Sequence, residues 1–133
     1  MNNLSLLPLL AAFSTFPLWL IEQFLPYPWF IEELVKYFFS LQIYRSKTVN
    51  KTILAFLTAI AFALSESFLY LSTDAISGNL TSFLQRLLFT VPMHIATFLV
   101  LFYGCRSNKP MIRLTLLVSS MAIHYYFNRF LAV

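Results

Sequence analysis

Apolar residues run through the chain in five long stretches that short polar segments separate. The stretches cover residues 4–24, 28–44, 52–72, 82–104 and 111–131, and each is close to the ~20 residues with which a helix crosses the hydrocarbon core of a bilayer. They lack the alternation of apolar and polar residues that half-buried strands show. The pattern therefore predicts an all-α fold, a polytopic membrane helix bundle of about five transmembrane helices, in a single domain over residues 1–133.

The composition also favours a membrane protein. Of the 133 residues, 59% are hydrophobic and 11% are charged, whereas soluble domains contain roughly 25% charged residues. The single cysteine, Cys105, excludes an intramolecular disulfide, and we interpret it as a small apolar core residue. The N-terminal stretch has neither a basic segment nor a small-residue cleavage site, so we interpret it as a retained membrane helix and not as a signal peptide.

Basic residues lie in alternate linkers and predict an orientation. The second and fourth linkers contain or adjoin Arg45, Lys47, Lys51, Arg106, Lys109 and Arg113, whereas the first and third contain no Lys or Arg. The positive-inside rule then predicts a multi-pass protein of the cell membrane with its N-terminus cytoplasmic and its C-terminus extracytoplasmic. Arg129 near the outer end is the exception. Because the basic residues account for topology, we expect no binding to nucleic acid.

Ionisable residues also occur within the apolar stretches, where each costs about 2.5–3.5 kcal/mol at a helix centre. The stretch "PWFIEELVKYFF" contains Glu32, Glu33 and Lys36, and helical spacing lets the lysine reach both carboxylates from one face. The others are Glu22, Glu66, Arg86, His94, His124 and Arg129. Since lipid disfavours isolated charges, we expect several of them to share one hydrated cavity in the outer half of the bundle.

Purely structural interpretations exist for the same residues. The Glu32, Glu33 and Lys36 group can anchor a helix end as an interfacial ion cluster, and His94 can be a satisfied histidine between helices. Other polar residues can lie at the membrane interface or extend to the lipid head groups: Glu22, Arg86, His124, Asn128 and Arg129.

Four short motifs, in order along residues 32 to 128, resemble those of the PrsW intramembrane proteases, which belong to the glutamate-dependent superfamily that includes the CAAX proteases. "EELVK" (32–36) is similar to the EExxK motif, and "FALSE" (62–66) is similar to the FxxxE motif. "RLLFTVPMHIATFLVLFYG" (86–104) resembles the third motif, and "HYYFN" (124–128) resembles the closing HxxxN element.

The resemblance implies an intramembrane peptidase with a catalytic core at about residues 28–131. Its substrate would be a single-pass membrane protein, cleaved near the extracytoplasmic side by a water that a glutamate activates. The implied roles are Glu32 as general base, Glu33 held by Lys36, His94 binding the water or polarising the carbonyl, Glu66 holding His94, His124 and Asn128 donating to the oxyanion, and Arg86 in support.

The sequence leaves the cofactor and two other functions open. No HExxH motif is present, so we expect no metal, with zinc held by Glu66, His94 and His124 as the alternative. A non-catalytic membrane scaffold of the same superfamily is one alternative function. A small proton-coupled transporter is the other, although the internal repeats typical of transporters are absent from the sequence.

Overall fold

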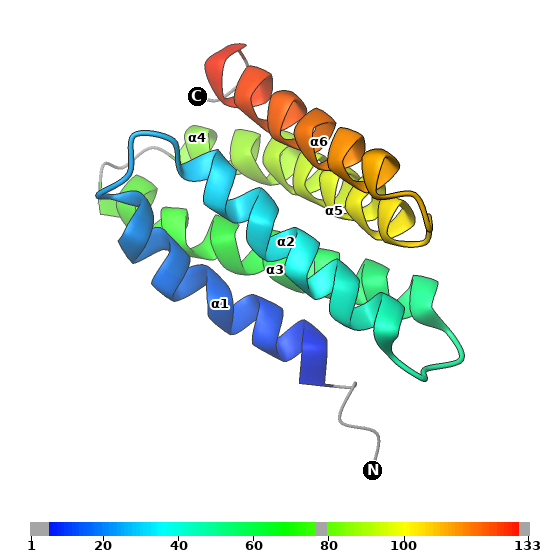
Figure 1. Ribbon diagram of the computed structural model, residues 1–133. Coiled ribbons are helices and arrows are strands. Elements are labelled where there is room, and N and C mark those ends of the chain that lie inside the picture. Colours follow the sequence, from blue (N-terminus) through cyan, green and yellow to red (C-terminus); the bar gives the residue numbers. More distant parts are fainter. Residues whose placement is uncertain (1–5, 77–79, 131–133) are drawn as a thin grey trace.

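The structure, a computed structural model, describes residues 6–76 and 80–130, and it describes residues 72–76, 82 and 86 by their backbone alone. Helices account for nearly all of this part, which contains no strand, so the predicted all-α bundle is confirmed (Figure 1). The elements are α1 (Leu7–Glu22), α2 (Pro28–Arg45), α3 (Lys51–Ile76), α4 (Leu80–Gln85), the π-helix η2 (Arg86–Thr90), α5 (Val91–Cys105) and α6 (Pro110–Phe130). The main difference from the predicted bounds is that the third helix continues to Ile76 instead of ending near Ser72.

Prolines begin several of these helices. Pro28 and Pro110 are the first residues of α2 and α6, and Pro92 lies in the first turn of α5. A proline at this position costs little, because the N–H that it lacks would have no partner within the helix. Pro92 cannot continue the ladder from the preceding turn, and the chain there widens into η2. The fourth predicted span is therefore α4, η2 and α5 in succession.

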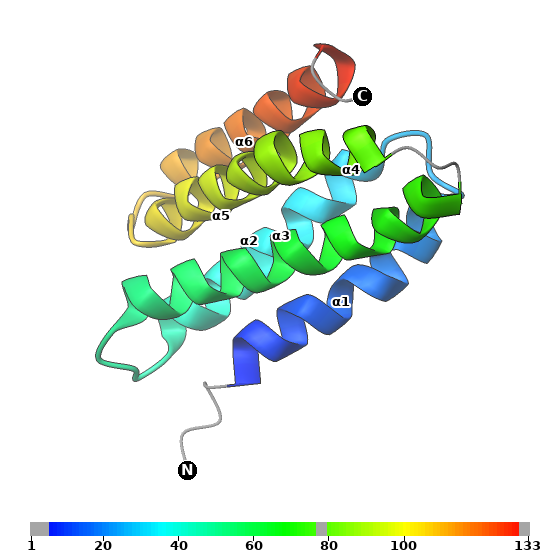
Figure 2. The same ribbon diagram turned by 180° about the vertical axis from the view of Figure 1, so that it is seen from behind.

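The helices pack side by side and alternate in direction, as the short linkers predict. Helix α5 contacts α2, α3 and α6, whereas α1 packs mainly on α3. Figures 1 and 2 show that the linkers after α2 and α5 lie at one end of the molecule, and the linker after α1 lies at the other. Helix α5 therefore lies against α2, α3 and α6, and these four helices share one interior.

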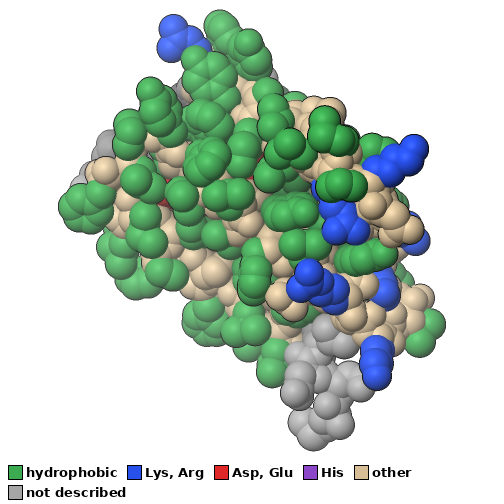
Figure 3. All heavy atoms as spheres, viewed as in Figure 1, with side chains coloured by type: hydrophobic (Ala, Val, Ile, Leu, Met, Phe, Trp, Pro, Cys, Tyr) green, Lys and Arg blue, Asp and Glu red, His purple; other side chains and the backbone are tan. Residues whose placement is uncertain are grey.

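The outer surface of the bundle is apolar. Exposed large hydrophobic side chains occur on all the long helices, among them Phe13, Phe38, Phe68, Tyr103 and Val118. Lys and Arg side chains gather at the end with the linkers after α2 and α5, and hydrophobic side chains cover most of the remaining face (Figure 3). Two helical segments, Lys51–Leu71 and Phe83–Cys105, have the length and hydropathy to cross a membrane by themselves, and the apolar α1 is shorter.

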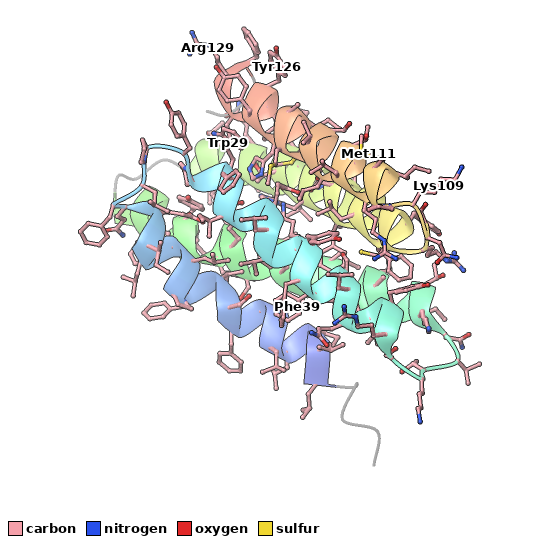
Figure 4. All side chains as sticks on the ribbon, in the orientation of Figure 1. Trp29, Phe39, Lys109, Met111, Tyr126 and Arg129 are labelled. Atoms are coloured by element: carbon pink, nitrogen blue, oxygen red, sulfur yellow. The ribbon has the colours of Figure 1, made fainter. Side chains whose placement is uncertain are left out.

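Aromatic residues mark the end opposite the basic linkers. Trp29 at the start of α2 stacks edge-on against Tyr125 of α6, with ring centroids 5.6 Å apart. Tyr126 and Phe130 stack in the last turns of α6, 6.0 Å apart, and Figure 4 places Trp29 and Tyr126 toward the same end as Arg129. Amphipathic rings of this kind favour the level of the lipid head groups.

Candidate active site

A cluster of polar side chains lies inside this apolar bundle. Its members come from four helices and are each at most 9% exposed: Glu32, Glu33 and Lys36 (α2), Glu66 (α3), His94 and Thr97 (α5), and Ser120 and His124 (α6). The molecule thus has apolar residues outside and ionisable residues inside. Charged groups buried in this way require partners, because isolated charges are strongly disfavoured at low dielectric.

Glu33 is the best-satisfied member of the cluster. Its Oε1 atom lies 2.6 Å from Lys36 Nζ and 2.9 Å from His124 Nδ1, and its Oε2 atom accepts a hydrogen bond of 2.6 Å from Ser120 Oγ. A carboxylate only accepts, so the Nδ1 atom of His124 is the donor and carries the hydrogen. The Nε2 atom of neutral His124 then keeps a free lone pair.

Lys36 connects α2 to α5. Besides Glu33, its ammonium contacts His94 Nδ1 at 2.7 Å and donates to Thr97 Oγ1 at 3.2 Å, and it lies 5.5 Å from the centroid of the Phe62 ring. An ammonium has three donors and no acceptor, so His94 Nδ1 is the acceptor and the ring hydrogen of neutral His94 is on Nε2. Lys36 therefore fixes both the position and the tautomer of His94.

The two histidine rings face one another and Glu66. Their centroids are 5.0 Å apart and their planes nearly perpendicular, at 88°. His94 Nε2 lies 3.1 Å from Glu66 Oε1, but the N–H does not point along this line closely enough for a hydrogen bond. The N–H of His94 is therefore available to another acceptor in the site.

Glu32 differs from its neighbour Glu33. Its Oε2 atom lies 3.6 Å from His124 Nε2 and 3.9 Å from His94 Nδ1, beyond hydrogen-bond distance in both cases. Glu32 Oε2, Glu66 Oε2 and His94 Nε2 are all buried without a hydrogen-bond partner. Buried polar atoms are paired in the great majority of cases, so three unpaired atoms in one cluster indicate a place for a water, an ion or a substrate.

Comparison with known proteins identifies the family at this point. A family model described as PrsW family intramembrane metalloprotease matches residues 8–133. The chain belongs to the PrsW family. Comparisons with curated proteins and with solved structures gave no match. Family membership supports an intramembrane peptidase that works in a membrane on a membrane-protein substrate, and the family description implies a metal ion.

The residues of this PrsW chain fit a divalent cation such as zinc. Ligand atoms of Glu32, His94 and His124 lie within 4.8 Å of one another. The zinc ligands considered from sequence were Glu66, His94 and His124, so the structure groups Glu32 with the two histidines where the sequence suggested Glu66. The His124 ring, with Nδ1–H bonded to Glu33, has the arrangement typical of a histidine whose other nitrogen binds metal. The one lone pair of neutral His94 faces Lys36 instead, so a cation and the ammonium would compete for it.

The charges of the cluster also fit a cation. Three carboxyl groups, those of Glu32, Glu33 and Glu66, face one ammonium among the side chains that the structure describes. Such an excess of negative charge at low dielectric must be compensated by protons or by a bound cation.

The positions predicted from sequence divide into three groups. Glu32, Glu33, Glu66, His94, His124 and Lys36 lie together in the cluster. Asn128 is exposed, one turn beyond His124 on α6, and lies outside the cluster. The side chain of Arg86 is outside the described residues.

Sequence reasoning missed two polar residues of the cluster, Thr97 and Ser120. Thr97 follows His94 by three residues and Ser120 precedes His124 by four, so helical spacing places each on the same face as a histidine. Glu22 of α1, interpreted above as an interface residue, is half-buried and close enough to Glu32 and Glu66 for their charges to interact. No motif in the sequence pointed to Glu22.

Proposed function

We propose that this PrsW chain is a peptidase that hydrolyses a peptide bond of a membrane-protein substrate with a water that Glu32 activates. The observation that carries the proposal is Glu32 Oε2, buried between two histidines with no hydrogen-bond partner. A general base needs a free lone pair within reach of the proton that it takes. Glu33 lacks this property because it already accepts from Lys36, Ser120 and His124.

In the proposed reaction, the water oxygen attacks the scissile carbonyl carbon while one water proton moves to Glu32. The carbon–nitrogen bond then breaks, and the proton on Glu32 moves to the leaving amine. The Nε2–H of His94, which lacks an aligned acceptor, is the donor that we assign to the carbonyl oxygen as negative charge develops there. His124 would need a second proton to donate in the same way, because its single hydrogen is bonded to Glu33.

A metal ion would give Glu32 a different role in the same hydrolysis, that of a ligand and not of a free general base. When bound by Glu32, His124 and His94, zinc would polarise the water and the carbonyl. A chelator followed by readdition of zinc tests this version on the purified protein. Loss and recovery of cleavage, together with a fall and recovery of the melting temperature, would support a metal-dependent enzyme, whereas unchanged values would support the metal-free version.

The cluster also suggests the side of cleavage. Glu32 is four residues after Pro28, so it lies about one turn into α2 from the end opposite the basic linkers. If those linkers are cytoplasmic, the reaction takes place near the extracytoplasmic side of the membrane. Residues 28–131 supply the groups with roles in this mechanism, and we propose them as the catalytic core of a single domain.

The test of the function is cleavage of a reporter set of single-pass membrane proteins by the reconstituted chain. We expect cleavage by the wild type and its loss in Glu32→Gln and His94→Ala, with all proteins present in the membrane in equal amounts. Ser119→Ala is the control, since Ser119 is a half-buried neighbour of the cluster residue Ser120 and has no proposed role. Equal cleavage by wild type and both variants would reject the proposal.

A further inference from the structure

The Lys36 side chain is held at three points that come from two helices. Its Nζ atom lies 2.6 Å from Glu33 Oε1 on its own helix, α2. On α5 it lies 2.7 Å from His94 Nδ1 and 3.2 Å from Thr97 Oγ1. An ammonium has three hydrogens, so these three acceptors use all its donors. Lys36 therefore links Glu33 to His94, and Thr97 completes its set of partners.

Thr97 is oriented for this contact by its own helix. It is 1% exposed and follows His94 by three residues on α5, and its hydroxyl donates to the backbone carbonyl of His94 at 3.2 Å. Because the single hydrogen of the hydroxyl points at this carbonyl, the oxygen lone pairs remain for a hydrogen of Lys36. Thr97 thus accepts from Lys36 within one turn of the histidine that Lys36 also contacts.

We propose that Thr97 is a positioning residue that keeps the Lys36 ammonium against His94 Nδ1. The ammonium in turn holds the imidazole ring in the direction in which its Nε2–H can donate to the substrate carbonyl. Without the hydroxyl, one ammonium hydrogen would be buried without an acceptor, which is costly, and the ammonium could turn away from His94 to pair it. The inference rests on the proposed function of His94, and it gives a role to a residue that the motif resemblance leaves without one.

The kinetic test removes one buried hydroxyl at a time. Thr97→Val removes it at nearly constant volume, and Thr97→Ser keeps it. Thr58→Val is the matched control, because Thr58 is also fully buried and its hydroxyl donates to the Leu54 carbonyl of its own helix. We expect Thr97→Val to lower kcat about 10-fold with little change in KM, Thr97→Ser to recover most of the loss, and Thr58→Val to match the wild type. Equal kcat in wild type and Thr97→Val, or an equal fall in Thr97→Ser or Thr58→Val, would overturn the proposal.

A spectroscopic measurement needs no activity. The chain contains two histidines, so isotopically labelled histidine gives two sets of ring signals in NMR spectra, and His124→Asn assigns them. We expect Thr97→Val to shift or broaden the ring signals of His94, and Thr97→Ser and Thr58→Val to leave them close to their wild-type positions. Unchanged His94 signals in Thr97→Val, or an equal displacement in Thr97→Ser, would overturn the proposal. If the wild type cleaves no reporter while Thr97→Val alone displaces the His94 signals, the proposed function fails and the positioning of His94 stands.

Discussion

Two adjacent glutamates of α2 have opposite surroundings because successive helical residues point about 100° apart. Glu33 faces Lys36 and α6, where both of its oxygens accept hydrogen bonds, and Glu32 faces the two histidines with one oxygen unpaired. The helix geometry thus separates the two glutamates into one held by several partners and one, Glu32, that we propose as the general base. This division gives each residue a separate experimental signature.

The signature of Glu33 is stability. Its replacement in Glu33→Ala leaves the Lys36 ammonium buried beside His94 and Thr97 without its carboxylate, and breaking a buried ion pair in this way costs about 3–5 kcal/mol. We expect a large fall in melting temperature in detergent for Glu33→Ala. Glu32→Gln, which removes no ion pair, should stay close to the wild type in stability while losing cleavage. Equal losses of stability in the two variants would contradict the division of roles.

Ser120 offers a second test at the same scale. Its hydroxyl donates to Glu33 Oε2 at 2.6 Å, and removing a donor from a buried acceptor costs about 1–3 kcal/mol. We therefore expect Ser120→Ala to lower the melting temperature by several degrees. Ser119→Ala, one position away and half-buried, should have a much smaller effect. If the two alanine variants have the same melting temperature, the hydrogen bond between Ser120 and Glu33 does not contribute to stability as expected.

The sequence predicted most residues of the candidate site, but it misplaced one residue and could not place another. Charge within apolar stretches gave a longer list of candidates, and the resemblance to the four motifs selected the six that lie together: Glu32, Glu33, Lys36, Glu66, His94 and His124. The resemblance to the HxxxN element implied a site role for Asn128, but the structure leaves Asn128 exposed. Glu22 was on that list, but it could not be placed near Glu32 from sequence, because the two residues lie on different helices and no motif covers α1.

At the scale of the elements, the helix bounds were largely predictable because prolines and basic linkers punctuate the apolar stretches. The π-helix ahead of Pro92 was not, since sequence shows that a regular helix is interrupted there but does not specify how the chain accommodates the proline. The close approach of α5 to α6 could not be predicted from the sequence either. It depends on Gly104, where an added Cβ atom would lie 2.9 Å from Leu116 Cδ1.

This close approach predicts a graded response at Gly104. Alanine should be nearly neutral, because the flexible end of Leu116 can move and the helix gains up to about 1 kcal/mol from losing a glycine. Gly104→Val should overpack the contact and destabilise the protein by about 1–3 kcal/mol. Cleavage should fall as well, because α5 carries His94 and α6 carries His124, with ring centroids 5.0 Å apart.

The control for Gly104→Val is the double variant with Leu116→Ala, which removes Leu116 Cδ1, the nearest atom that an added Cβ would meet. We expect this second change to restore part of the melting temperature and of the cleavage rate. If Leu116→Ala simply adds its own loss, the contact between α5 and α6 does not limit their approach.

At the scale of the whole molecule, the bundle reverses the distribution of a soluble protein, with ionisable groups inside and apolar side chains outside. The apolar outer surface favours contact with lipid. The buried ionisable groups can hold water within a membrane, where lipid alone would exclude it. The two ends also differ, since basic linkers lie at one end and aromatic rings at the other (Figures 3 and 4). The asymmetry of the ends predicts how the chain sits in a membrane.

Labelling of single cysteines by a membrane-impermeant maleimide measures that orientation. In a Cys105→Ala background, which removes the buried native thiol, we would introduce Tyr27→Cys in the linker after α1 and Val49→Cys in the linker after α2. Both native side chains are well exposed, at 61% and 96%. Because the basic linkers should be cytoplasmic, we expect intact cells to label Tyr27→Cys, and Val49→Cys to react only after permeabilisation. The opposite labelling would reverse the orientation and would move the proposed cleavage to the cytoplasmic side.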